Sequence, residues 1–280
     1  MTRNAGSNLF AFLLVMAAPL GGQWLNYPTP GIPRMPDGKP NLTAQAPRAP
    51  NGKPDLSGVW HVEPTPLTEM RRLYGDMVKN AEATGVAGNL SISKYAANIL
   101  VDFRPEETPL LSGVPLRPAS GGTCLPAGIP FAFLLADPNK IVQAPGLIVI
   151  MYESDGTHRQ IYTDGRALPL ERQPSWLGYS AGRWEGDTLV VDTVGFNDKT
   201  NLDVMGHPHS EALRVEERYH RRDFGHLDVE MTFYDPKMYT GPFTIKITQQ
   251  LLADSDILEY VCNENEKDRA PLNTGAGPGK

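Results

Sequence analysis

Histidines and carboxylates gather between residues 206 and 230, a segment that holds four of the six histidines. His207 and His209 are separated by a single residue, and Glu211 continues the same alternation. A His-x-His pair beside a carboxylate suits either proton transfer or the binding of a metal ion. A third interpretation, loop residues held in place by hydrogen bonds, stays open at this point.

A carboxylate in the following segment, Glu217, lies where its neighbours are apolar. In the run 213–222, a period of two places Glu217 on the same face as two aliphatic residues and Tyr219. An interior carboxylate is costly unless it is paired, and burial favours its neutral form, which makes Glu217 a candidate acid or base. The alternative is a structural ion pair with an inward arginine such as Arg159.

Neighbouring runs supply residues for binding a substrate. Arg159 alternates onto an inward face, where it would hold a substrate carboxylate with two hydrogen bonds, or would instead pack over Trp60. The connection 197–211 is too long for a hairpin turn and would overhang one mouth of a barrel. We therefore assign substrate binding to Arg159, Tyr162, Trp176, Tyr179, Tyr219 and Asp198.

A succession of predicted β-strands carries these side chains. From residue 141 onward, short runs of β-branched and aromatic residues are separated by compact turns, beginning with one run at 141–153 and ending with one at 258–262. Together with the run 56–62 they make about nine strands. A meander of this size protects its edges most simply by closing, so the sequence predicts a mainly β fold, an antiparallel up-and-down β-barrel.

An insertion is predicted between the first strand and the rest of the barrel, over 63–140. Apolar residues at helical spacing indicate a helix over 65–83, and prolines and glycines dominate 104–140. The barrel domain as a whole is predicted to span 56–268, with a flexible tail at 269–280.

The N-terminal region divides into a leader and a proline-rich arm. Residues 1–22 have the layout of a secretory signal peptide, with a buried N-terminal helix as the alternative, and no other stretch reaches membrane length. Residues 23–55 form an arm in which the heptapeptide at 36–42 is echoed at 50–56. Export predicts a periplasmic or secreted protein, without a membrane span once the leader is cleaved.

The cysteine content fits an exported chain. Cys124 and Cys262 are the only two cysteines and lie far apart in the sequence. One long-range disulfide between them would reduce the entropy of the unfolded chain. Two buried thiols are the alternative, and neither cysteine belongs to a C-x-x-C motif.

Several classes of function are disfavoured. The formal net charge is −6 and no basic stripe is visible, so nucleic acid is not expected as a partner. The segment 178–182 reads Gly-Tyr-Ser-Ala-Gly, but no helix follows it, whereas the nucleophile elbow of an esterase requires a strand, a sharp turn and a helix.

Two resemblances appear on these motifs. The segment 56–60, Leu-Ser-Gly-Val-Trp, resembles the G-x-W opening of lipocalin-type barrels, in which the tryptophan closes the base. With the stretches that begin at 175, 206 and 235, the chain also resembles a large family of exported bacterial proteins of unassigned activity. The first resemblance implies a lipocalin-like fold, and the second implies no mechanism.

Three functional hypotheses follow. The first is cofactor-free acid–base chemistry of the lyase, decarboxylase, hydratase or isomerase type on an aromatic or apolar small acid, with His207 or His209 as acid or base, Glu217 as its partner and Arg159 as the anion clamp. The second is a non-catalytic carrier of a small apolar or aromatic ligand. The third is a metal-dependent hydrolase using His207, His209 and Glu211. The sequence does not determine the oligomeric state.

Overall fold

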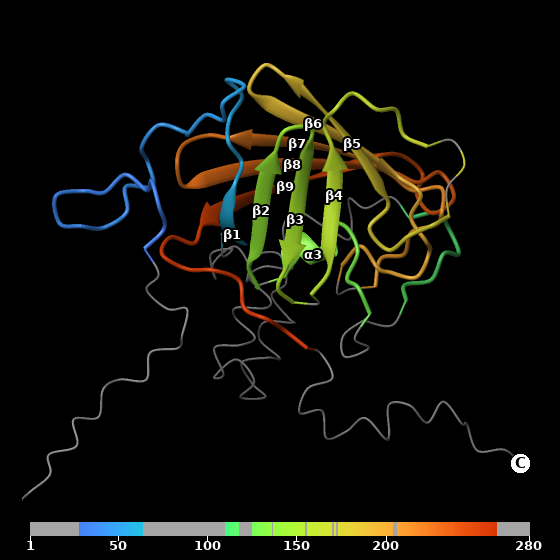
Figure 1. The fold of residues 1–280 in the computed structure, drawn as a ribbon. Coiled ribbons are helices and arrows are strands. Elements are labelled where there is room, and N and C mark those ends of the chain that lie inside the picture. Colours follow the sequence, from blue (N-terminus) through green and yellow to red (C-terminus); the bar gives the residue numbers. More distant parts are fainter. Residues whose placement is uncertain are drawn as a thin grey trace, which may run out of the picture.

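The computed structural model describes residues 28–63, 110–117, 125–135, 137–154, 156–169, 171, 173–203 and 206–261. The predicted leader at 1–22, the predicted helix at 65–83, the tail at 269–280, Cys124 and Cys262 lie outside these residues. Nine strands surround one interior (Figure 1). Their bounds are β1 Gly58–Val62, β2 Asn139–Ala144, β3 Leu147–Tyr152, β4 His158–Tyr162, β5 Tyr179–Glu185, β6 Thr188–Val194, β7 Arg214–Arg221, β8 His226–Tyr234 and β9 Phe243–Leu251.

The sheet closes into a barrel because β1 pairs with both β2 and β9. Eight of the nine neighbouring pairs are antiparallel, but β4 and β5 run parallel and are in register only at Ile161 and Tyr162 of β4. A mainly β barrel is therefore confirmed. A strictly antiparallel up-and-down order is not, because a long connection, 163–178, carries the chain back before β5 starts.

The number of strands agrees with the sequence prediction, but their identities differ at two places. The run 141–153 is a hairpin, β2 and β3, that turns at Gly146, where the positive φ of 75° suits a residue without a side chain. The predicted last strand is not formed over its described part, 258–261.

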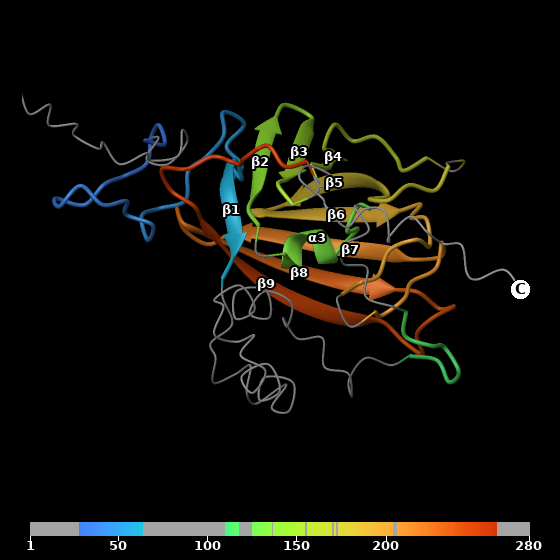
Figure 2. The same cartoon turned by 90° about the horizontal axis from the view of Figure 1, so that it is seen from below.

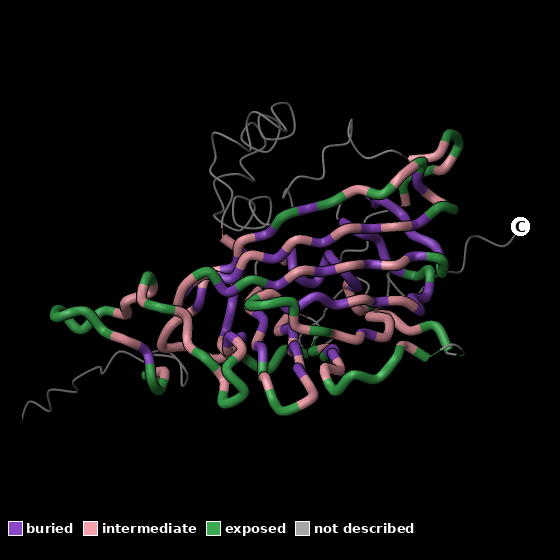
Figure 3. Tube along the Cα trace, turned by 90° about the horizontal axis from the view of Figure 1, so that it is seen from above, coloured by how far each residue is buried: buried purple, intermediate pink, exposed green. Residues whose placement is uncertain are grey.

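Alternating side chains build the core. In β8 the residues Leu227, Val229, Met231 and Phe233 are buried, while the residues between them are half-buried on the outer face, as Figure 3 shows along the strands. This confirms the period-two pattern expected of a strand with one face inside.

The arginine that lies over the Trp60 ring is Arg221 of β7. Its guanidinium carbon lies 4.8 Å from the centre of the Trp60 ring, and its nitrogen Nη1 donates to the carbonyl oxygens of Asp55 and Ser57. Packing of Arg159 over Trp60, the alternative considered above, is therefore wrong. Arg221 therefore joins the end of the arm to β7.

A short helix, α3 (Phe131–Leu134), packs against the interior of the barrel (Figure 2). All four of its residues are buried. The Phe133 ring contacts Tyr152 with 5.4 Å between ring centres and Tyr219 with 6.2 Å. Part of the insertion therefore fills interior space, so the barrel is not simply hollow.

The arm is attached to the barrel at several points, while the turn of its first repeat projects away from the strands (Figure 1). Each copy of its repeat forms a turn that is closed by a β-bridge, between Arg34 and Pro40 in the first copy and between Arg48 and Pro54 in the second. Arg34 pairs with Asp254 after β9, and Arg48 pairs with Asp187 in the β5–β6 turn, both at 2.6 Å between nitrogen and oxygen. These exposed pairs add little stability individually, but they fix where the arm lies.

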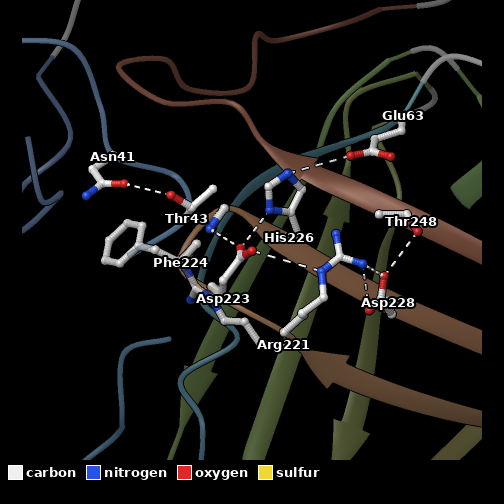
Figure 4. Close-up of polar contacts among 11 residues, drawn as sticks. Asn41, Thr43, Glu63, Arg221, Asp223, Phe224, His226, Asp228 and Thr248 are labelled. Atoms are coloured by element: carbon white, nitrogen blue, oxygen red, sulfur yellow. Dashed lines mark hydrogen bonds and ion pairs between the residues drawn. The ribbon is translucent and has the colours of Figure 1, made fainter. Parts of the chain in front are cut away.

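The β7–β8 turn also forms a hydrogen bond with the arm. The Gly225 amide donates to the carbonyl oxygen of Leu42 at 2.7 Å. Next to it, Nδ1 of His226 lies 2.7 Å from Asp223 and Nε2 lies 3.7 Å from Glu63 (Figure 4). His226 thus connects the turn to the end of β1. Within the described ranges, no helix has the length and apolar character needed to cross a bilayer.

Candidate functional site

The predicted inward orientation of Glu217 is present. Glu217 of β7 and Arg159 of β4 are both fully buried and form an ion pair across the barrel interior. Two guanidinium nitrogens of Arg159 each donate to a different carboxylate oxygen, one of them at 2.9 Å. This geometry is the structural pair considered above as the alternative to an acid–base role.

Hydroxyl groups complete the pair. Tyr219 donates to Glu217 at 2.7 Å, Thr193 contacts the other carboxylate oxygen at 3.3 Å, and Nε of Arg159 donates to Ser180 at 3.0 Å. Each carboxylate oxygen therefore accepts two hydrogen bonds. Neither the Glu217 carboxylate nor the Arg159 guanidinium therefore has an unpaired charge that could bind a substrate.

The electrostatics of this network keep Arg159 charged. Burial by itself would lower the pKa of Arg159, but the charge of Glu217 and the hydrogen bonds to it outweigh burial and raise the pKa above its ordinary value. Burial, followed by the nearby charge of Glu217, raises the pKa of Tyr219 well above its ordinary value. Tyr219 is therefore a hydrogen-bond donor to the pair, and no ligand contact is needed to explain it.

The two candidate histidines lie in a separate, buried network on the β6–β7 connection. Nδ1 of His207 lies 2.6 Å from Asp203. Nε2 of His209 lies 2.6 Å from the hydroxyl of Thr200, and its Nδ1 lies 3.2 Å from the carbonyl oxygen of Ser210. Burial lowers the pKa of His209, so its ring is neutral at pH 7. Both of its nitrogens are occupied by the loop itself.

The structure does not bring the histidines together with Glu217. Among the described residues, the hydrogen bonds of Glu217 go to Arg159, Thr193 and Tyr219, whereas the ring of His209 bonds to Thr200 and Ser210. The two other acidic candidates are exposed, Glu211 at the surface and Asp198 in the same connection.

Metal binding finds no support in the part of the chain that the structure describes. No group of three or more His, Cys, Asp or Glu side chains there is placed to hold an ion. The proposed set of His207, His209 and Glu211 is included in that statement.

A pocket opens where β4 and β5 separate. It has a volume of about 460 Å³ and contains four predicted substrate-binding residues. These are Arg159, Tyr162, Trp176 and Tyr179, and the other lining residues are Pro126, Gly156, Thr157, His158, Gln160, Ser175, Leu177, Gly178 and Ser180. We call this the seam pocket, because it lies between β4 and the segment that precedes β5.

Local backbone geometry creates the seam pocket. Gly178 has a φ of 67°, and just before it Ser175 forms a parallel bridge with Phe196 instead of with β4. A Cβ atom on Gly178 would lie 2.8 Å from a methyl group of Thr193, so glycine is needed for this turn. The segment before Gly178 therefore does not run alongside β4, and the seam pocket lies in the gap between that segment and β4.

The walls are aromatic and the floor is polar. Tyr162, Trp176 and Tyr179 supply the walls, while Arg159 and Ser180, each only 2% exposed, lie beneath them. Lys199 sits 5.9 Å from the centre of the Trp176 ring. Such a pocket suits a flat, largely apolar molecule that offers a few hydrogen bonds.

The sequence reasoning missed the pocket's position and residues such as His158, Gln160 and Gly178. One signal was available. The connection 163–178 is much longer than the other turns after residue 141, apart from 195–213, and a parallel pair requires a long crossover.

Known proteins add no further constraint. A comparison with protein-family models finds no match, and neither do comparisons with curated proteins and with solved structures.

Proposed function

We propose that this protein binds a small, flat, mostly apolar molecule in the seam pocket and acts as a carrier or receptor for it. The observation that supports this best is the convergence of Tyr162, Trp176 and Tyr179 on one pocket. Its volume of about 460 Å³ falls within the range of roughly 300–1,000 Å³ that is usual for small-molecule sites.

Carriage is favoured over acid–base catalysis because the candidate catalytic groups are already engaged. Glu217 is paired with Arg159, and both ring nitrogens of His209 are bonded within its own loop. A general acid or base must reach the substrate proton, and neither group lines the seam pocket.

The lipocalin-like character and the export of the chain belong to the same proposal. Stacking of Arg221 on Trp60 at the closed base supports the first, since the tryptophan of a G-x-W opening is expected to close that end. A periplasmic or secreted location rests on the leader at 1–22 alone.

Fluorescence titration with the neutral dye N-phenyl-1-naphthylamine tests the binding. Trp176→Ala and Tyr179→Ala should each weaken binding by about 1–2 kcal/mol, or roughly tenfold in Kd. Tyr234→Ala is the matched control, because Tyr234 is a half-buried aromatic residue on the outer face of β8 with its own cation neighbour, Arg214. Equal losses in all three variants, or no binding by the wild type, would refute the proposal.

A further inference from the structure

Among the residues that the structure describes, the β4 edge at His158, beside the seam pocket, has no backbone partner. Toward β3, Thr157 accepts a hydrogen bond from Tyr152 and Thr163 donates one to Gly146, both at 2.9 Å. Backbone groups alternate sides along a strand, so the N–H and C=O of His158 face away from β3, toward the pocket.

No residue of β5 is in register with His158. The parallel pairing of β4 with β5 covers only Ile161 and Tyr162, and the chain before β5 turns away at Gly178. The pocket thus presents one backbone donor and one backbone acceptor side by side. An unpaired strand edge of this kind binds groups that carry the complementary donor and acceptor.

The floor of the pocket offers no free positive charge. The charge of Arg159 is balanced by Glu217, and its nitrogens donate to Glu217, Thr193 and Ser180. Lys199 near the Trp176 ring is exposed, so water and salt screen its attraction for an anion. An acidic ligand would therefore lose its hydration without gaining a buried ion pair.

We propose that the ligand of the seam pocket is a neutral aromatic molecule carrying a carboxamide, lactam or similar donor–acceptor pair, which hydrogen-bonds to the His158 edge of β4 while its ring packs among the aromatic walls. The proposal rests on the binding function proposed above. It replaces the small acid expected from the sequence with a neutral amide, because a primary amide supplies both a donor and an acceptor.

Three probes of similar size and ring system test it on the full-length protein. Kd is measured by quenching of tryptophan fluorescence for 1-naphthamide, for the anion 1-naphthoate and for N,N-dimethyl-1-naphthamide, which has no donor. We expect 1-naphthamide to bind at least about fivefold more tightly than either of the others. Its Kd should change little between about 0.05 and 0.5 M salt.

Backbone variants locate the contact. His158→Pro removes the pocket-facing N–H and leaves pairing with β3 intact, so it should abolish the preference for 1-naphthamide over the dimethyl probe. His158→Ala removes only the imidazole and should keep the preference. If His158→Pro fails to fold, the three-probe comparison on the wild type decides the question.

The outcomes separate the two proposals. If no probe binds, the binding function itself is wrong. If 1-naphthoate binds as tightly as 1-naphthamide, or the dimethyl probe equals it, binding stands and the amide assignment is overturned.

Discussion

Replacing Glu217 by glutamine should destabilise the fold strongly while leaving its shape unchanged. The substitution preserves size but removes the charge that balances Arg159, whose side chain is only 1% exposed. An arginine left unpaired in a protein interior costs about 3–5 kcal/mol. That is a large part of the 5–15 kcal/mol by which folded domains are typically stable.

Urea unfolding followed by tryptophan fluorescence measures this loss. Glu230→Gln provides the matched control, because Glu230 also lies on a central strand and pairs with Lys246 at 3.1 Å, but on the exposed face. The control should lose no more than about 1 kcal/mol.

A double variant distinguishes the stability that the ion pair contributes from the cost of leaving one buried charge without its partner. Arg159→Met with Glu217→Leu removes both charges and fills similar volume, so most of the stability lost in Glu217→Gln should return. If Glu217→Gln lost no more stability than Glu230→Gln, the ion pair would not be structural. A role for Glu217 in proton transfer would then regain support.

Three further predictions concern the histidine loop, the seam and the cysteines. Because burial lowers the pKa of His209 below 6.5, the unfolded chain takes up a proton that the folded one does not, so the free energy of unfolding should fall as pH drops below about 6.5. His209→Gln should flatten that dependence in urea titrations at about pH 7 and pH 5, and an unchanged slope would contradict it. Gly178→Ala should cost roughly 1–3 kcal/mol more in urea unfolding than Gly186→Ala, since both glycines have positive φ but only Gly178 would place a Cβ against neighbouring atoms. Cys124 and Cys262 should form a disulfide, because they are the only two cysteines of a chain whose leader predicts export. Thiol titration of the unfolded, unreduced protein should therefore find no free thiol, and two would refute the pairing.

Much of the barrel was predictable because strands with one buried face alternate in sequence. The pattern of β8 and the inward position of Glu217 both follow from a period of two. The same pattern does not indicate which neighbour a strand selects, so the parallel pairing of β4 with β5 was missed.

The candidate site could likewise be predicted only in part. Arg159, Tyr162, Trp176 and Tyr179 were chosen individually as ligand-binding residues, and the structure places them in one pocket. Arg159 lies in the barrel interior, as expected, but its charge is paired with Glu217 rather than free for a substrate carboxylate. The spacing of His207 and His209 made them candidates for acid–base chemistry. Spacing does not indicate which hydrogen-bond partners the ring nitrogens have in the folded protein.

The sequence by itself determined that this chain builds a closed β-structure with an inward carboxylate, because alternation and turn chemistry are local properties of neighbouring residues. Only the tertiary structure decided that Arg159 neutralises this carboxylate and that a pocket lies between β4 and the segment before β5. Both depend on contacts between segments distant in sequence, such as Arg159 with Glu217 and Ser175 with Phe196. Such contacts arise when the sheet closes, and no local pattern encodes them.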